Sequence, residues 1–182
     1  MSQSEIEHFY PKTKQHWRKW LEKNHIKKDA VWLIHYKKTS GNPTLAWSDA
    51  VDEALCFGWI DSKAVSIDTI SFKQYYSKRK ARSTWSRVNK EKISQLMAEN
   101  KMSGAGLNCV EMAKQNGSWT ILDDVDRLII PPDLAKALKS KLAIRFRGLS
   151  KSAQKSHLQD LVLAKTTETR NQRIKRIVEK LS

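Results

Sequence analysis

The sequence is poor in cysteine: it has only Cys56 and Cys109, and both lie inside apolar runs. Small secreted domains held by disulfides are usually rich in cysteine, so this pattern favours buried, reduced thiols, with one disulfide between the two as the alternative. Apolar neighbours raise the pKa of a thiol, which makes Cys56 a poor nucleophile. The chain contains neither CxxC nor HExxH, which excludes zinc sites of familiar spacing, and we predict no metal site.

Glycine-rich phosphate-binding motifs are absent as well. Neither GxxxxGK[ST] nor GxGxxG occurs, so the common nucleotide-binding loops are excluded and we expect no cofactor. No apolar run approaches the ~20 residues that would span a bilayer. The first residues contain no apolar stretch of the kind found in signal peptides, so we expect a cytoplasmic protein.

Positive charge is abundant. The chain of 182 residues carries 34 Lys and Arg against 19 Asp and Glu, a net charge of +15. Such a charge attracts nucleic acid, anionic lipid or acidic protein, although a solvated lysine-rich surface would give the same composition. Seven tryptophans and 40% hydrophobic residues indicate a folded chain with a real core.

The hydrophobic pattern predicts an α+β fold: a small antiparallel sheet with packed helices, followed by an all-helical C-terminal half. We expect one domain over residues 1–182, which could be subdivided into an α+β part (1–118) and a helical part (119–182). Helices are predicted for residues 13–24, 87–100 and from about 167 to the end, and extended chain for 30–37 and 59–76. Ser48 is the expected N-cap of a short helix, and Gly58 its expected left-handed end.

A junction between helix and strand lies at Ala54–Ser62, where Asp61 and Ser62 follow the apolar residues. Such residues either project functional groups from a rigid base or satisfy the backbone of a turn. Asn89 adds a polar amide to the apolar stripe of the helix predicted for residues 87–100. Arg170 lies four residues before Ile174, on the extension of the apolar stripe of the last predicted helix. An inward Arg170 requires a bound anion or an acid such as Glu111, Asp160 or Asp61. The candidates for a shared pocket are Trp59, Asp61, Ser62, Trp85, Ser86, Asn89 and Arg170.

Aromatic residues are interspersed among cations between Phe72 and Lys92, with Glu91 as the single acid. Polyanion binding needs this mixture, because cations contact phosphates while aromatic faces stack on bases. A solvated basic loop beside structural aromatics would have the same composition. The candidates for polyanion binding are Lys73, Tyr75, Lys78, Arg79, Lys80, Arg82 and Arg87.

Several segments together resemble the YdeI/OmpD-associated family, also called bacteriocin-protection proteins. The resemblance implies a link to resistance against bacteriocins or cationic antimicrobial peptides, and it supplies no catalytic residues. A protein of charge +15 repels cationic peptides, so a resistance role would be indirect. The family's Pro-Arg pair before the Ser-x-Trp-Ser segment is missing its proline here. The segments are Ala54–Asp61, Ser83–Glu91, Met102–Gly106, Glu111–Lys114, Gly117–Trp119, Pro132–Leu138, Ala164–Lys165 and Glu168–Ile174.

Three hypotheses follow. The first is a non-enzymatic binding protein whose basic and aromatic residues engage an anionic partner such as nucleic acid. The second is a small-molecule-binding protein or enzyme with a pocket around Trp59, Asp61, Trp85, Asn89 and Arg170. The third is a protein-interaction module that uses the helical half. The sequence does not indicate the oligomeric state.

Overall fold

The computed structural model describes residues 6–182, which separate into two compact units. The first unit runs to Ser83 and includes Val88–Asn116; the second comprises Thr84–Arg87 and Gly117–Ser182. The boundary at Gly117 lies next to the subdivision expected from the sequence. A single domain over residues 1–182 stays a prediction.

The first unit contains a four-stranded sheet with helices. The strand order is β1-β2-β4-β3; β2, β4 and β3 pair antiparallel, and the short β1 pairs parallel with β2. The expected α+β class with a small sheet is therefore confirmed, and the parallel β1 makes the sheet mixed. The elements are β1 (His8–Phe9), α1 (Lys14–Asn24), β2 (Ala30–Tyr36), a 3-10 turn (Lys38–Ser40), α2 (Trp47–Cys56), β3 (Trp59–Ser66), β4 (Ser71–Lys78), α3 (Arg87–Ala98) and α4 (Gly104–Gln115).

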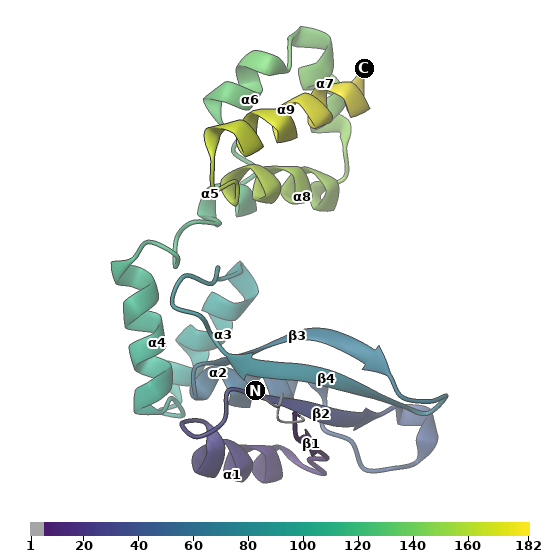
Figure 1. Cartoon of the computed structure of the whole chain (residues 1–182), viewed down its shortest axis with the longest axis vertical. Helices are drawn as coiled ribbons and strands as arrows, with labels where there is room; N and C mark the ends of the chain where they lie inside the picture. Colours follow the sequence, from purple (N-terminus) through teal and green to yellow (C-terminus); the bar gives the residue numbers. More distant parts are fainter. Residues whose placement is uncertain (1–5) are drawn as a thin grey trace, which may run out of the picture. The chain divides into compact units, whose positions relative to one another are not determined.

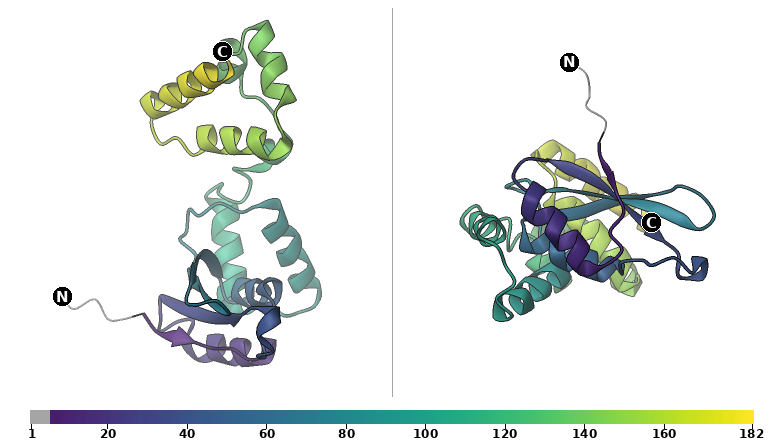
Figure 2. Two further views of the ribbon diagram at one scale, coloured as in Figure 1. Left: turned by 90° about the vertical axis from the view of Figure 1, so that its right-hand side faces the viewer. Right: turned by 90° about the horizontal axis from the view of Figure 1, so that it is seen from below.

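Helix α1 lies across one face of the sheet (Figures 1 and 2). It begins after Thr13, whose side chain accepts a hydrogen bond from the amide of His16, as expected of an N-cap. Its apolar side buries Trp17 against the ring of Tyr76 on β4, at a centroid distance of 5.6 Å. The indole N–H of Trp17 donates to the backbone oxygen of Ala50, which ties α1 to α2. This face of the sheet therefore forms the core of the unit.

Helix α2 begins at Trp47, two residues earlier than expected. Its N-cap is Ala46, which makes no side-chain cap, so the prediction that Ser48 is the cap is wrong. The hydroxyl of Ser48 accepts a hydrogen bond from the ammonium group of Lys92 on α3 instead. The Ser48 hydroxyl, which the local pattern assigned to capping the helix, is therefore hydrogen-bonded to a residue distant in sequence. Gly58 ends the helix turn at a φ of 73°, as predicted.

The second unit is helical throughout, which confirms the expectation for the C-terminal half (Figure 2). Its core contains Leu134, Phe146, Leu158 and Leu161, all almost completely buried. The predicted stripe of the last helix contributes to this core through Ile174 and its neighbours one and two turns on. The elements are α5 (Asp123–Asp126), α6 (Pro132–Ala137), α7 (Ser140–Gly148), α8 (Lys151–Val162) and α9 (Thr167–Leu181).

Candidate functional site

A row of side chains crosses the face of the sheet opposite the core. His8 lies opposite Trp32, and Trp32 lies opposite Tyr75 in the strand register. At an irregularity in the β3–β4 pairing, two residues of β3 face Tyr75, and one of them is Lys63. Side chains alternate across a strand, so these positions share one face. We call this surface the outer face; it consists of His8, Trp32, Lys63, Lys73 and Tyr75.

The outer face holds two ammonium groups against an aromatic pair. The Nζ atoms of Lys73 and Lys63 lie 4.8 and 5.5 Å from the ring centroid of Trp32. The rings of Trp32 and Tyr75 meet edge to face with their centroids 5.0 Å apart. Each exposed cation–π contact is worth about 0.5–1 kcal/mol, enough to orient a lysine without fixing it. Positive charge and aromatic surface are therefore presented together.

A hollow of about 470 Å³ adjoins Tyr75. Lys27 and Lys28 line it, and the ammonium group of Lys28 pairs with the carboxylate of Glu7 at 2.8 Å. Lys27 is exposed. The hollow extends the basic surface beyond the strands.

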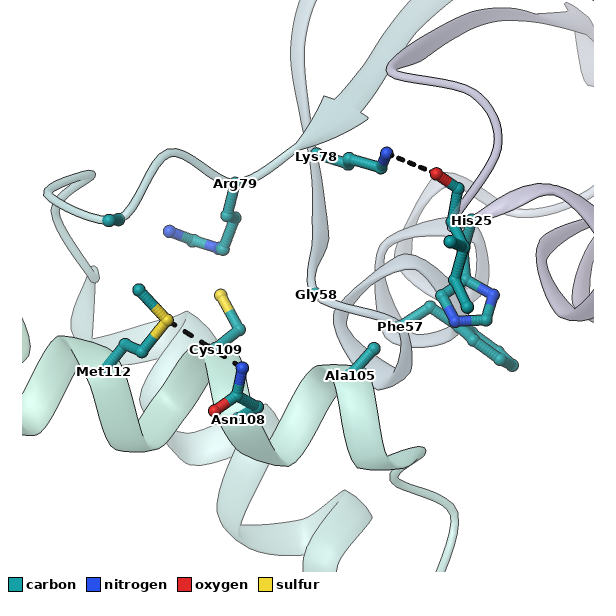
Figure 3. Close-up of a pocket in the computed structure, with 11 residues that line it drawn as sticks. His25, Phe57, Gly58, Lys78, Arg79, Ala105, Asn108, Cys109 and Met112 are labelled. Carbon is teal, nitrogen blue, oxygen red and sulfur yellow. Dashed lines mark hydrogen bonds between the residues drawn. The ribbon is translucent and has the colours of Figure 1, made fainter.

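A second feature of the first unit is a pocket of about 430 Å³ beside α4, which we call the α4 pocket (Figure 3). Phe57 and Gly58 line it from the end of α2, and Arg79 from the chain that follows β4. Helix α4 contributes Asn108 and Cys109. A Cβ atom at Gly58 would lie 3.3 Å from the backbone oxygen of Ala105, so the glycine allows α4 to approach closely. The pocket is thus framed by segments distant in the sequence.

Arg79 brings charge to the α4 pocket. Its backbone amide donates to the oxygen of Gly58 at 2.9 Å, and its Nη1 donates to the hydroxyl of Ser83 at 3.1 Å. Burial lowers the pKa of the guanidinium to about 10, because desolvation disfavours the charged form. The group therefore stays protonated at neutral pH.

Both cysteines are free thiols. Burial raises the pKa of Cys109, and the nearby Arg79 opposes this only in part. The pKa of Cys56 is also raised, first by burial and then by the charge of Glu53. Neutral thiols are weak nucleophiles, so neither cysteine has the environment of a catalytic thiolate.

The polyanion candidates from the sequence fall into three environments. Lys73 and Tyr75 belong to the outer face, whereas Lys78 and Arg79 line the α4 pocket. The ammonium group of Lys78 donates to the backbone oxygen of Ile26 at 2.7 Å and to the carboxylate of Asp29 at 2.9 Å. The exposed candidates beyond β4 are Lys80, Arg82 and Arg87.

Two of the four pocket candidates in the first unit, Trp59 and Asp61, form hydrogen bonds within it. Trp59 is fully buried, and its indole N–H donates to the backbone oxygen of His25 at 3.3 Å. Asp61 accepts hydrogen bonds from Trp47 at 2.9 Å and Gln74 at 3.0 Å. Ser62 is exposed on β3, and Asn89 is half-buried on α3.

The remaining pocket candidates belong to the second unit. Trp85 is buried with its ring centroid 5.0 Å from that of Trp119, and Ser86 is exposed. Arg170 forms a two-pronged ion pair with Asp133 and also donates to the oxygen of Leu161. The expected structural ion pair is present, with Asp133 in place of the three acids considered from the sequence. One pocket shared by all these residues stays a prediction.

Trp32 and Lys63 were missed by sequence reasoning. Trp32 lies in the extended segment predicted for residues 30–37, but its neighbours across the sheet depend on register. Lys63 reaches the aromatic pair only because the β3–β4 pairing is irregular. A local pattern contains no signal for that irregularity.

Within residues 6–182, no group of His, Cys, Asp and Glu side chains is arranged to hold a metal ion. Over the same residues, no helix is both long and apolar enough to cross a bilayer.

Two family models match the chain. Residues 9–109, more than half of the sequence, match a domain of unknown function, DUF8412. Residues 127–182 match OmdA, described as bacteriocin-protection, YdeI or OmpD-associated. The resemblance to the YdeI/OmpD-associated family is thus confirmed on residues 127–182, which lie in the second unit. No curated protein and no solved structure matches the chain.

Proposed function

We propose a function for a chain that belongs to the DUF8412 family through residues 9–109 and carries a YdeI/OmpD-associated segment at residues 127–182. The proposed function is binding of single-stranded nucleic acid, without catalysis, by the outer face of the sheet. The observation that carries the proposal is the placement of two lysine ammonium groups over the ring of Trp32, with Tyr75 at its edge.

Single strands are bound without sequence preference where aromatic rings receive bases and cations follow the phosphates. The outer face offers both within one row of strands. A base stacked on Trp32 would take the place of a lysine ammonium, and the displaced Lys63 or Lys73 could then meet the adjacent phosphate. Each stacked base contributes about 1–3 kcal/mol, so one aromatic pair supports modest affinity.

The net charge of +15 favours the same partner. It accelerates encounter with any polyanion and makes affinity depend on salt. An acidic protein would share that salt dependence, but it would make no use of a half-buried aromatic pair beside two cations. The aromatic pair therefore favours nucleic acid over other polyanions.

Fluorescence anisotropy of a labelled single-stranded oligonucleotide of about 12 nucleotides, a length in the usual range for such sites, tests the proposal. We expect binding at low salt that weakens as salt rises. The Lys63→Ala/Lys73→Ala variant should reduce the slope of log affinity against log salt by about 0.7 for each phosphate that the variant no longer neutralises. Trp32→Leu should weaken binding while leaving the salt slope nearly unchanged.

A matched control is Lys19→Ala/Lys23→Ala, which removes the same charge from exposed positions of α1. It should reduce affinity less than the outer-face pair. Equal reductions in affinity for the two double variants would show that net charge alone determines binding. That result, or no binding at low salt, would refute the outer face as the site.

A role in bacteriocin protection rests on the description of the OmdA family. We propose that any such role acts through an anionic partner, because the positive charge opposes direct capture of cationic peptides. The proposal also implies a cytoplasmic location, where nucleic acid is available.

A further inference from the structure

We infer that the α4 pocket is a second binding site, for a small aromatic carboxylate. The pocket volume of about 430 Å³ lies in the range of ligand sites, about 300–1,000 Å³. Arg79 and Lys78 line it among mostly apolar groups, and none of its lining residues belongs to the outer face. Neither family description assigns it a ligand.

The size of the pocket follows from small residues. Gly58 and Ala105 line it where α4 approaches the end of α2, and Ala81 lines it beside Arg79. Figure 3 shows Ala105 and Cys109 directed from α4 toward the two segments that carry Gly58 and Arg79. Larger side chains at these positions would fill the space, so the hollow depends on their size.

The walls determine the class of ligand. The Met112 thioether, which Figure 3 shows beside Cys109, offers apolar, polarisable contact for a ring. Arg79 supplies a charged donor with the fork geometry that matches a carboxylate. Partial burial strengthens such an interaction relative to bulk water, because the effective dielectric is lower. An apolar ring that bears one carboxylate satisfies both parts of the wall.

Asn108 gives the site a polar side group. Among residues 6–182, its amide nitrogen makes only a long contact, 3.9 Å, with the sulfur of Met112 (Figure 3). A ligand carboxylate could accept a hydrogen bond from this amide at little cost, because a thioether is a weak acceptor. We expect no covalent bond between the ligand and Cys109, because burial raises the pKa of its thiol and keeps it neutral.

The test uses the full chain and two matched probes, naphthalene-2-carboxylate and the neutral naphthalene-2-methanol. Isothermal titration calorimetry compares their affinities, and amide NMR spectra follow the Asn108 side chain and the Gly58 backbone. We expect the carboxylate to bind at least tenfold more tightly than the alcohol and to shift both signals. Equal affinity of the two probes, or no binding of either, overturns the inference.

Two variants locate the site. Ala105→Phe fills the pocket from an exposed helix position and should reduce carboxylate affinity at least tenfold, whereas Leu107→Phe on the same helix should not. Arg79→Met should bring the carboxylate down to the affinity of the alcohol; a melting temperature measured alongside shows whether that variant is folded. Unchanged affinity in Ala105→Phe overturns the inference even if Arg79→Met unfolds. Lys63→Ala/Lys73→Ala should leave carboxylate binding intact, which separates this site from the outer face.

Discussion

Helix α4 passes so close to the end of α2 that a Cβ atom added to Gly106 would lie 2.2 Å from the backbone oxygen of Cys56. That oxygen also accepts hydrogen bonds from the hydroxyl of Ser103, at 2.7 Å, and from its amide, at 2.9 Å. The start of α4 is therefore held against α2 by contacts that leave no room for a side chain.

Gly106→Ala should consequently destabilise the first unit. Overpacking against backbone costs about 1–3 kcal/mol, which exceeds the gain in helix propensity of about 1 kcal/mol. Urea unfolding followed by circular dichroism measures the difference. Gly104→Ala is the control, because an added Cβ there meets nothing within 4 Å. Equal stability of the two variants would contradict the close approach of α4.

The hydroxyl of Tyr76 should be dispensable for folding. It is buried and has no hydrogen-bond partner within residues 6–182, and burial raises its pKa, as does the charge of Asp61. Since an unsatisfied buried polar group costs about 1–3 kcal/mol, Tyr76→Phe should raise the free energy of unfolding by roughly 1 kcal/mol. Thermal melting of the variant tests this expectation.

Tyr10→Phe is the matched control. The Tyr10 hydroxyl donates to the backbone oxygen of Pro43, so its removal should lower stability by about 0.5–1.5 kcal/mol. The two tyrosine variants should therefore shift the melting temperature in opposite directions. A lower melting temperature in both would indicate that the Tyr76 hydroxyl has a partner in solution.

Much of this fold follows from local signals. The cap at Thr13 and the left-handed end at Gly58 each depend on a single residue and its immediate backbone. Sequence reasoning finds such features because no distant contact is involved. The Ser48 cap was predicted on the same grounds and was wrong, because a distant lysine uses that hydroxyl.

The site was predictable only in part. Lys73 and Tyr75 lie in a visibly basic and aromatic run, so composition alone selected them. Trp32 is more than 40 positions earlier, and only the β2–β4 register brings it to Tyr75. Arg170 was expected to need an acid, but Asp133 became its partner through the packing of α6 and α9.

His35 should make the stability of the first unit depend on pH. It is 2% exposed, its Nδ1 lies 3.1 Å from the backbone oxygen of Leu45, and its Nε2 has no hydrogen-bond partner among residues 6–182. Burial lowers its pKa below the usual 6.5. The unfolded chain therefore takes up a proton first as pH falls, and stability decreases from about pH 6.5 down to the folded pKa.

Urea unfolding between pH 7.5 and 5 measures this decrease. His35→Gln should flatten the profile in that window even if its overall stability is lower, whereas His16→Gln at an exposed position should leave the profile unchanged. NMR of the ring nitrogens should also show the proton on Nδ1, the atom that faces the backbone oxygen. A proton on Nε2 at neutral pH would contradict the assigned tautomer.

The Arg170–Asp133 pair should also lose stability as pH falls, but for a different reason. Protonation removes a stabilising charge from Asp133, whereas at His35 it adds a charge that burial disfavours. The hydrogen bonds from Arg170 hold the pKa of Asp133 below its usual range. Its contribution is therefore present above the unfolded pKa of about 3.9 and disappears as pH falls through the folded pKa. Both side chains are partly exposed, so the contribution should not exceed about 1 kcal/mol.

Asp133→Asn should accordingly be less stable than the parent at pH 7 and nearly equal to it at pH 2. Thermal unfolding at the two pH values provides the comparison. Asp124→Asn is a useful control, because Asp124 pairs with Arg127 one turn away on an exposed surface. A constant difference between parent and Asp133→Asn across the pH range would exclude an ionic contribution.

The irregular pairing of β3 has a consequence for the behaviour of the protein in concentrated solution. β3 is an edge strand, and a regular exposed edge invites pairing with the edge of another molecule. A register shift in that edge, with the charged Lys63 at the same point, interrupts the row of backbone groups that a second sheet would need. Lys63, which we assign to anion binding, should thus also oppose aggregation through the sheet edge. Replacing it by an apolar residue should reduce the solubility of the protein.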